Sequence, residues 1–504
     1  MIKEVKISDF TGGLNTNDST IAIADNQLKI ARNVFYEKET GEVRTINGLT
    51  QIGTDMLVNS LPVTKLLGAV IFNNLFYVMA SNGTVARLLY YASSTDTWTQ
   101  ANAQDFDKDA KVRFAVYQSK LWFVNGKTTN SNVLHFLTTG NVLSGLTTAS
   151  GLEEGINKLN LHLERFWISK GNKIFITVQY PQGIAGDWDA SSVYTGSKTA
   201  GLIQLDDDTE DEILDMVTHF GQLVIFRKKS IHVVSGATIL NSTIQKAFNA
   251  KGVFAPGSIS RADKNIYFYS TEGVKVFSGT TVLESSTEFD SVSTLTIDRN
   301  IRPTIEALTA DVRGYLMAYS FKDRYYLATS DDIYIYDEKS NGWSVFDVCG
   351  AEVFIEKDNF LYIGVGNKFY KLDDNDDFEI ESEIRTKDYT FGYDTIQKVF
   401  EKIILYFRTL ESESSLTFYW YIDGSSGGLL EPITLTSSAI IWDGQYSWDG
   451  EASWNNVAIS FKRFIKRKMK SGITFSFGIN STGTNRFFLS SANIIFDTLK
   501  REVR

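Results

Sequence analysis

Apolar and polar residues alternate in a pattern that recurs along most of the chain. Seven short runs of aliphatic and aromatic residues each follow a polar turn, at 75–78, 121–124, 166–168, 223–226, 266–269, 325–327 and 360–363. A second apolar segment follows each run and begins at Val85, Val133, Ile174, Ile231, Val274, Ile333 and Phe369. Asn, Gly, Asp, Ser or Lys stands between the two segments. Two apolar segments joined in this way are typical of a β-hairpin, so the sequence predicts seven hairpins.

The spacing of these hairpins predicts a β-propeller. Successive runs start about 35 to 60 residues apart, which leaves room for two further strands in each unit, and a propeller blade has four strands. One blade cannot bury both of its faces, but blades in a closed ring cover one another and leave no long edge exposed. We therefore predict an all-β chain in which residues 56–380 form a propeller of six to eight blades, with seven as the best estimate. The alternative is a series of aromatic-rich β-sandwiches without a ring.

Two repeats end in a kelch-like pattern, in which a strand closes on Tyr and a Trp follows. The pairs are Tyr91 with Trp98 and Tyr336 with Trp343, and Tyr180 with Trp188 is a looser third copy. We expect each Trp to pack between blades. The segment 281–310 is longer than a blade turn and has a weak helical period, which predicts a helix on the rim between the fifth and sixth blades.

The two flanks of the repeat differ from it. After 373–377 the chain has long alternating runs at 399–407, 416–422, 473–479 and 493–496, which predict a separate β-sandwich over residues 381–504. Residues 1–55 are expected to form an N-terminal arm. Within this arm, 24–33 is interpreted as a short helix with an Asp cap, and 43–46 as a strand that closes the ring by pairing with the last blade.

Composition and motifs weigh against catalysis. Cys349 is the single cysteine, and the four histidines lack the spacing of metal ligands, which argues against a disulfide framework and a zinc site. There is no GxSxG motif and no Walker loop, and the acidic run 206–212 is interpreted as a solvated loop. We expect a non-enzymatic protein without a cofactor. No apolar leader and no membrane-length apolar stretch is present, which predicts synthesis in the cytosol and no membrane partner.

Two further groups of residues are candidate binding sites. Asp373, Asn375 and Asp377 match the start of a calcium loop, but Phe378 and Ile384 replace the required Gly and Glu, so only a loose surface calcium site remains as a weak candidate. Trp442, Trp448 and Trp454 recur with a period of six. They are interpreted either as rings that stack on sugars or as aromatic turns packed against a sheet or a neighbouring subunit.

Charge is unevenly distributed along the chain. The net charge is −10, which argues against a basic nucleic-acid binder, and residues 381–504 carry 14 acidic and 15 basic residues. Residues 1–380 therefore carry −11. One basic run stands in the C-terminal part, formed by Lys462, Arg463, Lys466, Arg467, Lys468 and Lys470. It is interpreted as a solvated strand or as a docking surface for an acidic neighbouring subunit, with DNA contact as a third alternative.

The N-terminal segment carries several motifs in a fixed order. They are DFTGGLNT at 9–16, ADNQ at 24–27, ARNV at 31–34 and GEVRTING at 41–48. This series resembles the N-terminal segment of tailed-bacteriophage virion proteins, which have a GGLN loop, a short helix ending in A-x-N and a strand ending in R-x-G. The spacing from Arg44 to Gly48 is slightly longer here. A propeller followed by a terminal sandwich is also similar in architecture to the tail nozzle and tail hub proteins of short-tailed phages.

The resemblance implies a structural role in the virion tail. Such proteins form a homo-oligomeric ring, commonly of six copies, that contacts portal, adaptor or other tail proteins and tail fibres. Genomic DNA passes through the ring without specific binding. A neutral or acidic wall suits such a conduit because phosphates adhere to Lys and Arg, and the −11 of residues 1–380 agrees with this. The alternatives are a carbohydrate- or receptor-binding propeller, as in a tail-associated adhesin or glycan-active enzyme, and a free-standing kelch-like interaction scaffold.

Overall fold

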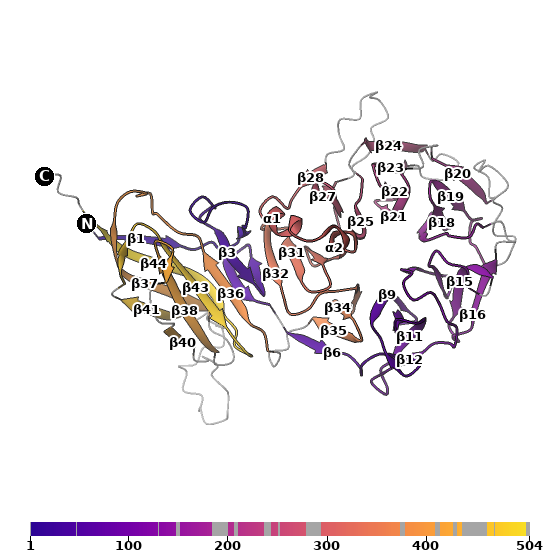
Figure 1. Cartoon of the computed structure of the whole chain (residues 1–504), viewed down its shortest axis with the longest axis horizontal. Helices are drawn as coiled ribbons and strands as arrows, with labels where there is room; N and C mark the ends of the chain where they lie inside the picture. The colour runs from indigo at the N-terminus through magenta and orange to yellow at the C-terminus, as the bar shows by residue number, and fades with distance from the viewer. Residues whose placement is uncertain are drawn as a thin grey trace, which may run out of the picture.

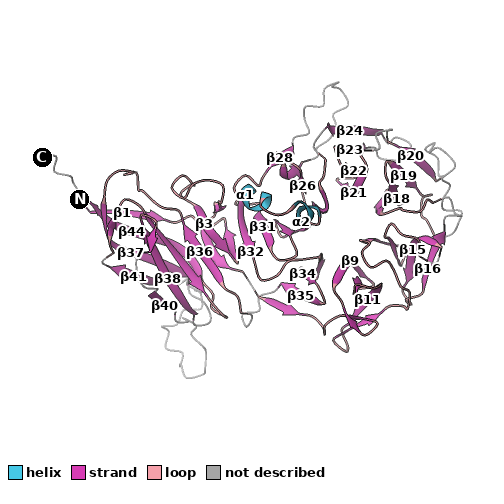
Figure 2. Cartoon of the chain, in the orientation of Figure 1, coloured by secondary structure: helices cyan, strands magenta, loops and turns pink. Residues whose placement is uncertain are grey.

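The computed structural model consists of a disc-shaped propeller with a β-sandwich at its side (Figure 1). It describes residues 2–46, 48–129, 131–147, 152–183, 200–205, 210–235, 243–249, 252–278, 294–372, 379–408, 414–426, 431–435, 461–467 and 469–499. Strands make up almost all of the described regular structure, and two short helices lie near the centre of the molecule (Figure 2). Neither helix is long and apolar enough to cross a membrane.

Seven four-stranded antiparallel blades form the propeller; six of them are separate sheets, and the strands of the sixth blade belong to an 11-stranded sheet shared with the sandwich. The first four blades are β9 (Lys65–Phe72), β10 (Leu75–Ser81), β11 (Ala86–Ala92) and β12 (Thr97–Gln100); β13 (Arg113–Tyr117), β14 (Lys120–Val124), β15 (Asn132–Thr138) and β16 (Leu143–Thr147); β17 (Lys158–His162), β18 (Arg165–Lys170), β19 (Lys173–Ile176) and β20 (Gly201–Gln204); and β21 (Ile213–His219), β22 (Gln222–Arg227), β23 (Ser230–Ser235) and β24 (Thr243–Asn249). The other three are β25 (Ala255–Arg261), β26 (Ile266–Ser270), β27 (Gly273–Phe277) and β28 (Thr294–Thr296); β29 (Met317–Phe321), β30 (Arg324–Ala328), β31 (Ile333–Asp337) and β32 (Gly342–Phe346); and β33 (Val353–Lys357), β34 (Phe360–Val365), β35 (Lys368–Leu372) and β6 (Leu49–Gln51). The innermost strand of each blade contacts that of the next, and β33 contacts β9, so the ring is closed. The prediction of an all-β propeller with seven blades is confirmed.

Each predicted hairpin corresponds to the second and third strands of a blade. The run at 121–124, for example, lies in β14, where Leu121, Trp122, Phe123 and Val124 are all buried. These strands are covered on both faces by the neighbouring blades, so they read as continuous apolar runs rather than as alternating ones.

The ring is closed by the N-terminal part of the chain, but not by the predicted residues. The strand expected at 43–46 is present as β5 (Glu42–Thr45), and it pairs with β4 and β44 of the sandwich. The closing strand is β6, which pairs antiparallel with β35 so that Leu49 lies opposite Leu372. Leu49 is buried against the strands of the seventh blade, and this burial fixes the closing position.

The tryptophans of the kelch-like pattern pack between blades, as predicted. The ring of Trp98 lies 5.3 Å from that of Phe369, so it joins the first blade to the seventh. The indole N–H of Trp343 in the sixth blade donates to the carbonyl of Ile297, directly after the fifth blade, at 2.9 Å. Trp188 lies outside the described residues.

The segment between the fifth and sixth blades contains helix, as expected. The helices α1 (Arg302–Glu306) and α2 (Ala310–Gly314) lie between β28 and β29. The Thr309 hydroxyl accepts a hydrogen bond from the Val312 N–H, which fixes the start of α2. Residues 279–293 are outside the described part.

The sandwich consists of two sheets packed face to face. One sheet contains β1 (Ile2–Ile7), β4 (Val34–Glu37), β5, β37 (Lys398–Arg408), β41 (Phe461–Arg467), β42 (Ser471–Gly472) and β44 (Phe488–Thr498). The other contains β2 (Gly13–Leu14), β3 (Gln27–Arg32), β36 (Ser382–Thr386), β38 (Ser414–Ile422), β39 (Ser425–Ser426), β40 (Glu431–Leu435) and β43 (Phe475–Ser481). Buried aromatic rings from both sheets, including Phe400, Phe418 and Phe477, form the core between them. A small hairpin of β7 (Leu57–Val58) and β8 (Leu61–Pro62) follows β6.

Two predictions about the N-terminal arm are wrong. Residues 27–32 form the strand β3 rather than a helix, because β3 has a partner on each side: β36 runs antiparallel to it and β2 parallel. The side chain of Asn26 donates to the Asp9 carboxylate at 3.2 Å and holds a turn before the strand. The arm is also not separate, because β1 to β5 complete the sandwich, so that module extends beyond residues 381–504.

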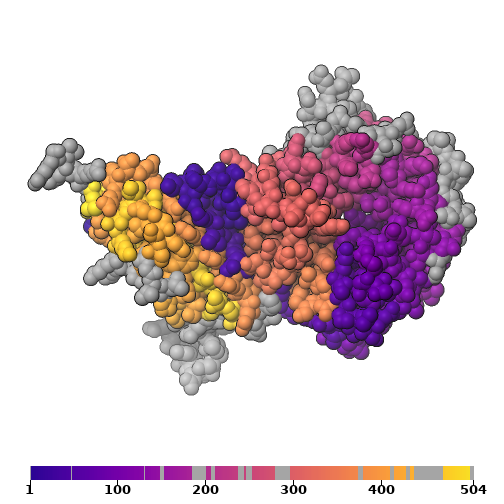
Figure 3. Space-filling model, viewed as in Figure 1, coloured from indigo at the N-terminus to yellow at the C-terminus, as the bar shows by residue number. Residues whose placement is uncertain are grey.

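The two modules share a continuous sheet. β3 pairs in parallel with β32 through Arg32 and Val345, so the sheet of the sixth blade continues into the sandwich. In the space-filling view, the indigo N-terminal segment fills the space between the sixth blade and the orange and yellow sandwich (Figure 3). The propeller and the sandwich are therefore joined by packed structure and not by a linker alone.

Candidate functional sites: the module junction and the channel mouth

The glycines of the GGLN loop allow close contact between the two modules. Gly13 has φ +76°, and a β-carbon at this position would lie 2.4 Å from the backbone nitrogen of Trp343. A side chain is excluded both by the left-handed backbone and by this contact with the sixth blade. The hydroxyl of Tyr36 donates to the Trp343 carbonyl at 2.8 Å, so the same residue is held from both sides.

Asn15, the asparagine of the same loop, is buried, and both its amide nitrogen and its amide oxygen form hydrogen bonds. Its Nδ2 donates to Gln27 Oε1 at 2.9 Å and to Asp18 Oδ2 at 3.0 Å, and its Oδ1 accepts from the backbone of Asn17 and Asp18. The next residue, Thr16, donates its N–H to the carbonyl of Asn300 at 2.8 Å. Asn15 thus shapes the loop that reaches the propeller just before α1.

The A-x-N motif ties three segments together. Asn33 has φ 55°; its Nδ2 donates to Asp347 at 2.5 Å and to the Glu381 carbonyl at 2.7 Å, and its Oδ1 accepts from the Asp347 N–H at 3.0 Å. Arg32 forms ion pairs with Asp347 at 3.3 Å and with Glu381 at 2.7 Å. Asp347 follows the sixth blade and Glu381 precedes β36. Arg32 and Asn33 therefore hold the propeller and the sandwich together where β3 joins the sheet of the sixth blade, a place called the crossing below.

The last motif stabilises the sandwich itself. Gly41 has φ +77°, and a β-carbon there would lie 2.3 Å from the Ser8 carbonyl oxygen. The carboxylate of Glu42 is buried, pairs with Arg408 at 2.5 Å and accepts from the Ser490 hydroxyl. These motif residues therefore fasten the junction or the sandwich.

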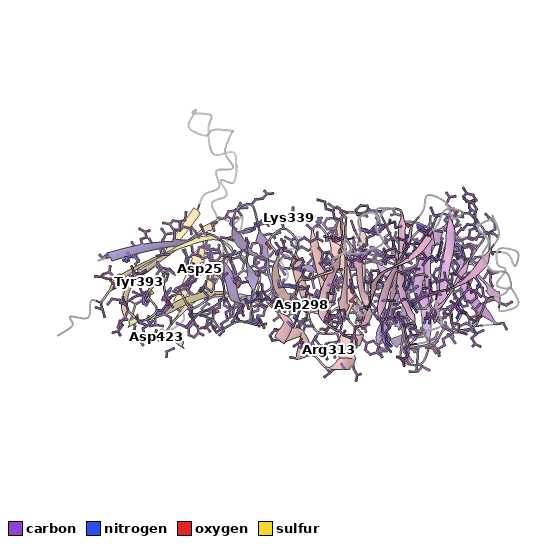
Figure 4. The ribbon with its side chains drawn as sticks, turned by 90° about the horizontal axis from the view of Figure 1, so that it is seen from above. Asp25, Asp298, Arg313, Lys339, Tyr393 and Asp423 are labelled. Carbon is purple, nitrogen blue, oxygen red and sulfur yellow. The ribbon has the colours of Figure 1, made fainter. Side chains whose placement is uncertain are left out.

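A second candidate site lies at one mouth of the propeller channel. The innermost strands of a propeller enter its channel in the same direction, so their first residues gather at one end. Here that end is a cavity of about 660 Å³, whose charged lining includes Lys111, Arg113 and Lys158. Arg313 of α2 is seen at one face of the disc and Lys339 at the opposite face (Figure 4). Because the last residue of α2, Gly314, and residues 315–318 also line the cavity, the mouth opens on the α2 face.

The cations at the mouth are only partly neutralised. Arg113 pairs with Asp215 across the channel at 2.6 Å, and the Lys111 ammonium donates to the Leu66 carbonyl at 3.1 Å. Burial lowers the pKa of Lys111 to about 8; Glu352 opposes this shift, and the nearby charges of Lys65 and Arg113 add to it. The charged form of Lys111 is therefore destabilised in this cavity.

Burial also lowers the pKa of Lys158, with Asp215 opposing the shift and Arg113 adding to it. Among the described residues, no acceptor lies within hydrogen-bond distance of the Lys158 ammonium, although its strand begins at the cavity wall. A partly desolvated ammonium without a partner favours an anion in its neighbourhood.

Replacing Lys111 with Met is expected to stabilise the protein at pH 7 by about 1–3 kcal/mol, because a lowered lysine pKa means that the folded state resists the proton. In the wild type this penalty is present in full below pH 8 and is relieved as the pH rises towards 10.5, where the lysine is neutral in both states. The difference between variant and wild type should therefore shrink over this range. Urea denaturation at pH 7 and at pH 10 measures it, and a variant that is less stable than the wild type at pH 7 contradicts the prediction.

The binding-site residues proposed from the sequence are not among those that line this cavity. Lys462, Arg463, Lys466 and Arg467 lie in β41, which pairs with β37 alone among the described strands and so forms an edge of its sheet. Lys470 is exposed just after this strand. Lys468, Trp442, Trp448, Trp454, Asp373, Asn375 and Asp377 lie outside the described residues.

The described part of the chain holds no group of three or more His, Cys, Asp or Glu side chains suited to a metal ion. His135 and His162 lie in propeller strands, and burial lowers the pKa of each to about 4. Burial raises the pKa of the Cys349 thiol to about 12, so this thiol is a poor nucleophile at neutral pH.

The channel mouth was not found from the sequence. The usable signal is a basic residue at or just before the first strand of three consecutive blades, at Lys65, Lys111 and Lys158. The apolar runs that reveal the repeat lie in the second strand of each blade and not in the first, so they do not point to these lysines.

The solved structures similar to this chain include two propeller domains. The WD40 domain of Neurospora crassa Pan2 has a TM-score of 0.41 at 10% identity, covering 64% of this chain and 95% of its own. The β-propeller domain of Cps50 (Swd1) from Myceliophteria thermophila has a TM-score of 0.40 at 8% identity, covering 64% and 98%. The extracellular domain of BT4673 from B. thetaiotaomicron has a TM-score of 0.41 at 9% identity, covering 77% of this chain and 46% of its own, so this chain spans less than half of it. No protein-family model and no curated protein matches the sequence. The fold assignment rests on the strand order.

Proposed function

We propose that this chain is a non-catalytic structural component of a bacteriophage tail, a nozzle or hub ring that lines the DNA exit channel and joins neighbouring tail or connector rings. The observation that carries the proposal is the use of the N-terminal motifs. The segment that resembles tailed-phage virion proteins places Gly13, Asn15 and Asn33 at the crossing between the propeller and the sandwich.

A fixed crossing suits a subunit of a closed ring. Ring closure requires that each subunit present its two contact surfaces at one defined angle, since a variable angle produces open or irregular assemblies. The shared sheet and the buried polar contacts of Asn33 hold the two modules at such an angle. The motif residues are explained by this requirement without any reaction chemistry.

The sandwich offers strand edges for contacts between copies. β41, with four residues of the basic run, forms one edge of its sheet among the described strands, and β1 pairs with β44 alone. Edge strands pair readily with further strands, and a basic edge is attracted to the net negative charge that residues 1–380 give a neighbouring copy.

Light scattering after size-exclusion chromatography tests the proposal. We expect a particle of about six times the 56.6 kDa mass of one chain, and a ring with a central opening in electron micrographs. The double variant Lys462→Glu, Lys466→Glu reverses charge on β41 and is expected to weaken assembly. The matched control Lys357→Glu lies in the propeller, in β33, and should assemble as the wild type does. A protein that remains a single chain at all concentrations and salt conditions contradicts the proposal.

A further inference from the structure

We propose that the basic mouth of the propeller channel binds an acidic monosaccharide, a sugar that carries a carboxylate or a phosphate group. The site is formed by the cavity among the innermost strands, with Lys111, Arg113 and Lys158 for the anionic group and Tyr315 for the sugar ring. This inference does not depend on the proposed assembly role, because it concerns a cavity within one propeller.

The cation arrangement selects for an oxyanion. Arg113 is fixed from one side by Asp215 at 2.6 Å, and Asp215 is itself held by the N–H of Met216 at 2.9 Å. An anchored guanidinium is preorganised for a planar or tetrahedral oxyanion. Lys158 completes the group from the adjacent blade, and an anion between the two would supply the partner that its ammonium lacks among the described residues.

The opposing carboxylates have other partners. Glu352 accepts the N–H groups of Leu66 at 2.8 Å and of Gly366 at 3.1 Å, and so joins the first blade to the seventh. Asp215 is engaged by Arg113. Neither carboxylate forms an ion pair with Lys111 or Lys158 in the described part of the chain, so the lysine charges remain available to a ligand.

Tyr315 gives the cavity an aromatic wall. Tyr315 directly follows α2, lines the same cavity and is 71% exposed, so its ring is accessible to a ligand. The Lys65 ammonium lies 5.8 Å from the centre of its ring. A flat apolar surface beside a cationic group matches a ligand that has both a C–H face and an anionic substituent.

The size of the cavity favours a small ligand over a polymer. Its volume of about 660 Å³ lies within the range of small-molecule sites, roughly 300–1,000 Å³. A nucleic acid that binds through its backbone needs many phosphate contacts spread over a long surface.

Isothermal titration calorimetry of the full chain tests the site with four probes: glucuronate, glucose 6-phosphate, inorganic phosphate and glucose. We expect saturable binding of the two acidic sugars, weaker binding of phosphate and none of glucose. Lys158→Met should weaken binding of the acidic sugars at least tenfold. Tyr315→Ala should weaken the acidic sugars at least threefold and leave phosphate unchanged, since only the sugars use the ring.

Lys357→Met is the matched control, because Lys357 ends an innermost strand and therefore lies towards the opposite mouth. Its affinities should equal those of the wild type, and circular dichroism should show that all variants remain folded. The inference is overturned if neither acidic sugar binds at millimolar concentration, or if Lys158→Met binds them as tightly as the wild type. It is also overturned if glucose binds as tightly as glucuronate.

Discussion

Replacing Asp211 with Ala is expected to lower the free energy of unfolding by about 3–5 kcal/mol, because the change breaks an ion pair in which both side chains are buried. The side chain of Arg227 is 0% exposed, and its Nη1 lies 3.4 Å from Asp211 Oδ2. The same carboxylate accepts the N–H of Lys229 at 2.5 Å and the hydroxyl of Ser230. Asp211 belongs to the acidic run interpreted from the sequence as a solvated loop, and for this residue the interpretation is wrong.

Glu210→Ala is the matched control for this prediction. Glu210 is the neighbouring residue of the same run, and it pairs with Lys229 at 2.5 Å on the surface. An exposed pair contributes at most about 1 kcal/mol, so this variant should unfold close to the wild type. Guanidinium denaturation followed by fluorescence compares the two. Equal losses in both variants would show that the buried position of Asp211 is not what matters.

Trp343→Ala is expected to cost about 3–5 kcal/mol, as other truncations of large buried aromatic side chains do. Trp343 is 1% exposed, packs its ring 5.2 Å from that of Tyr336 and packs its backbone on Gly13. Since this contact lies at the crossing of the two modules, the variant should also loosen the sandwich from the propeller. We expect faster proteolytic cleavage in the segments that connect the two modules, between β5 and β6 and between β35 and β36, detected by mass spectrometry of the fragments.

Trp98→Ala separates these two effects. Trp98 also packs between blades, against Phe369, but far along the chain from the crossing. It should destabilise the propeller without exposing the junction to protease. If both variants are cut at the same place and the same rate, Trp343 has no particular role at the junction.

The part of the fold that could be predicted is the part whose burial is complete. The second strand of each blade holds a run of buried apolar residues, so β14 and β30 could be located from their residues alone. The first and fourth strands are more exposed, as the pattern of β12 shows, and their residues resemble those of loops. The hairpins therefore predict the number of blades, but they do not locate the strands that line the channel.

The errors concern segments whose structure depends on distant partners. Residues 27–32 carry a cap-like Asp before them, but pairing with β36, which begins only at Ser382, makes them a strand. The strands β5 and β6 are both short, and only the positions of β44 and β35 decide which one closes the ring. The channel mouth was missed for the same reason, because the lysines of successive blades come together only when the ring is closed.

The closing strand also sets the order of folding during synthesis. β6 ends at Gln51, but its partner β35 begins only at Lys368. β1 pairs with β44, which lies near the C-terminal end of the chain. At about 5–20 residues per second, the ribosome needs on the order of tens of seconds to supply the partner of β6. During this interval the N-terminal segment has edges that can pair with other chains. Slower translation or a higher concentration of nascent chains should therefore increase exchange of this segment between copies, which makes the yield of correctly closed rings sensitive to expression rate.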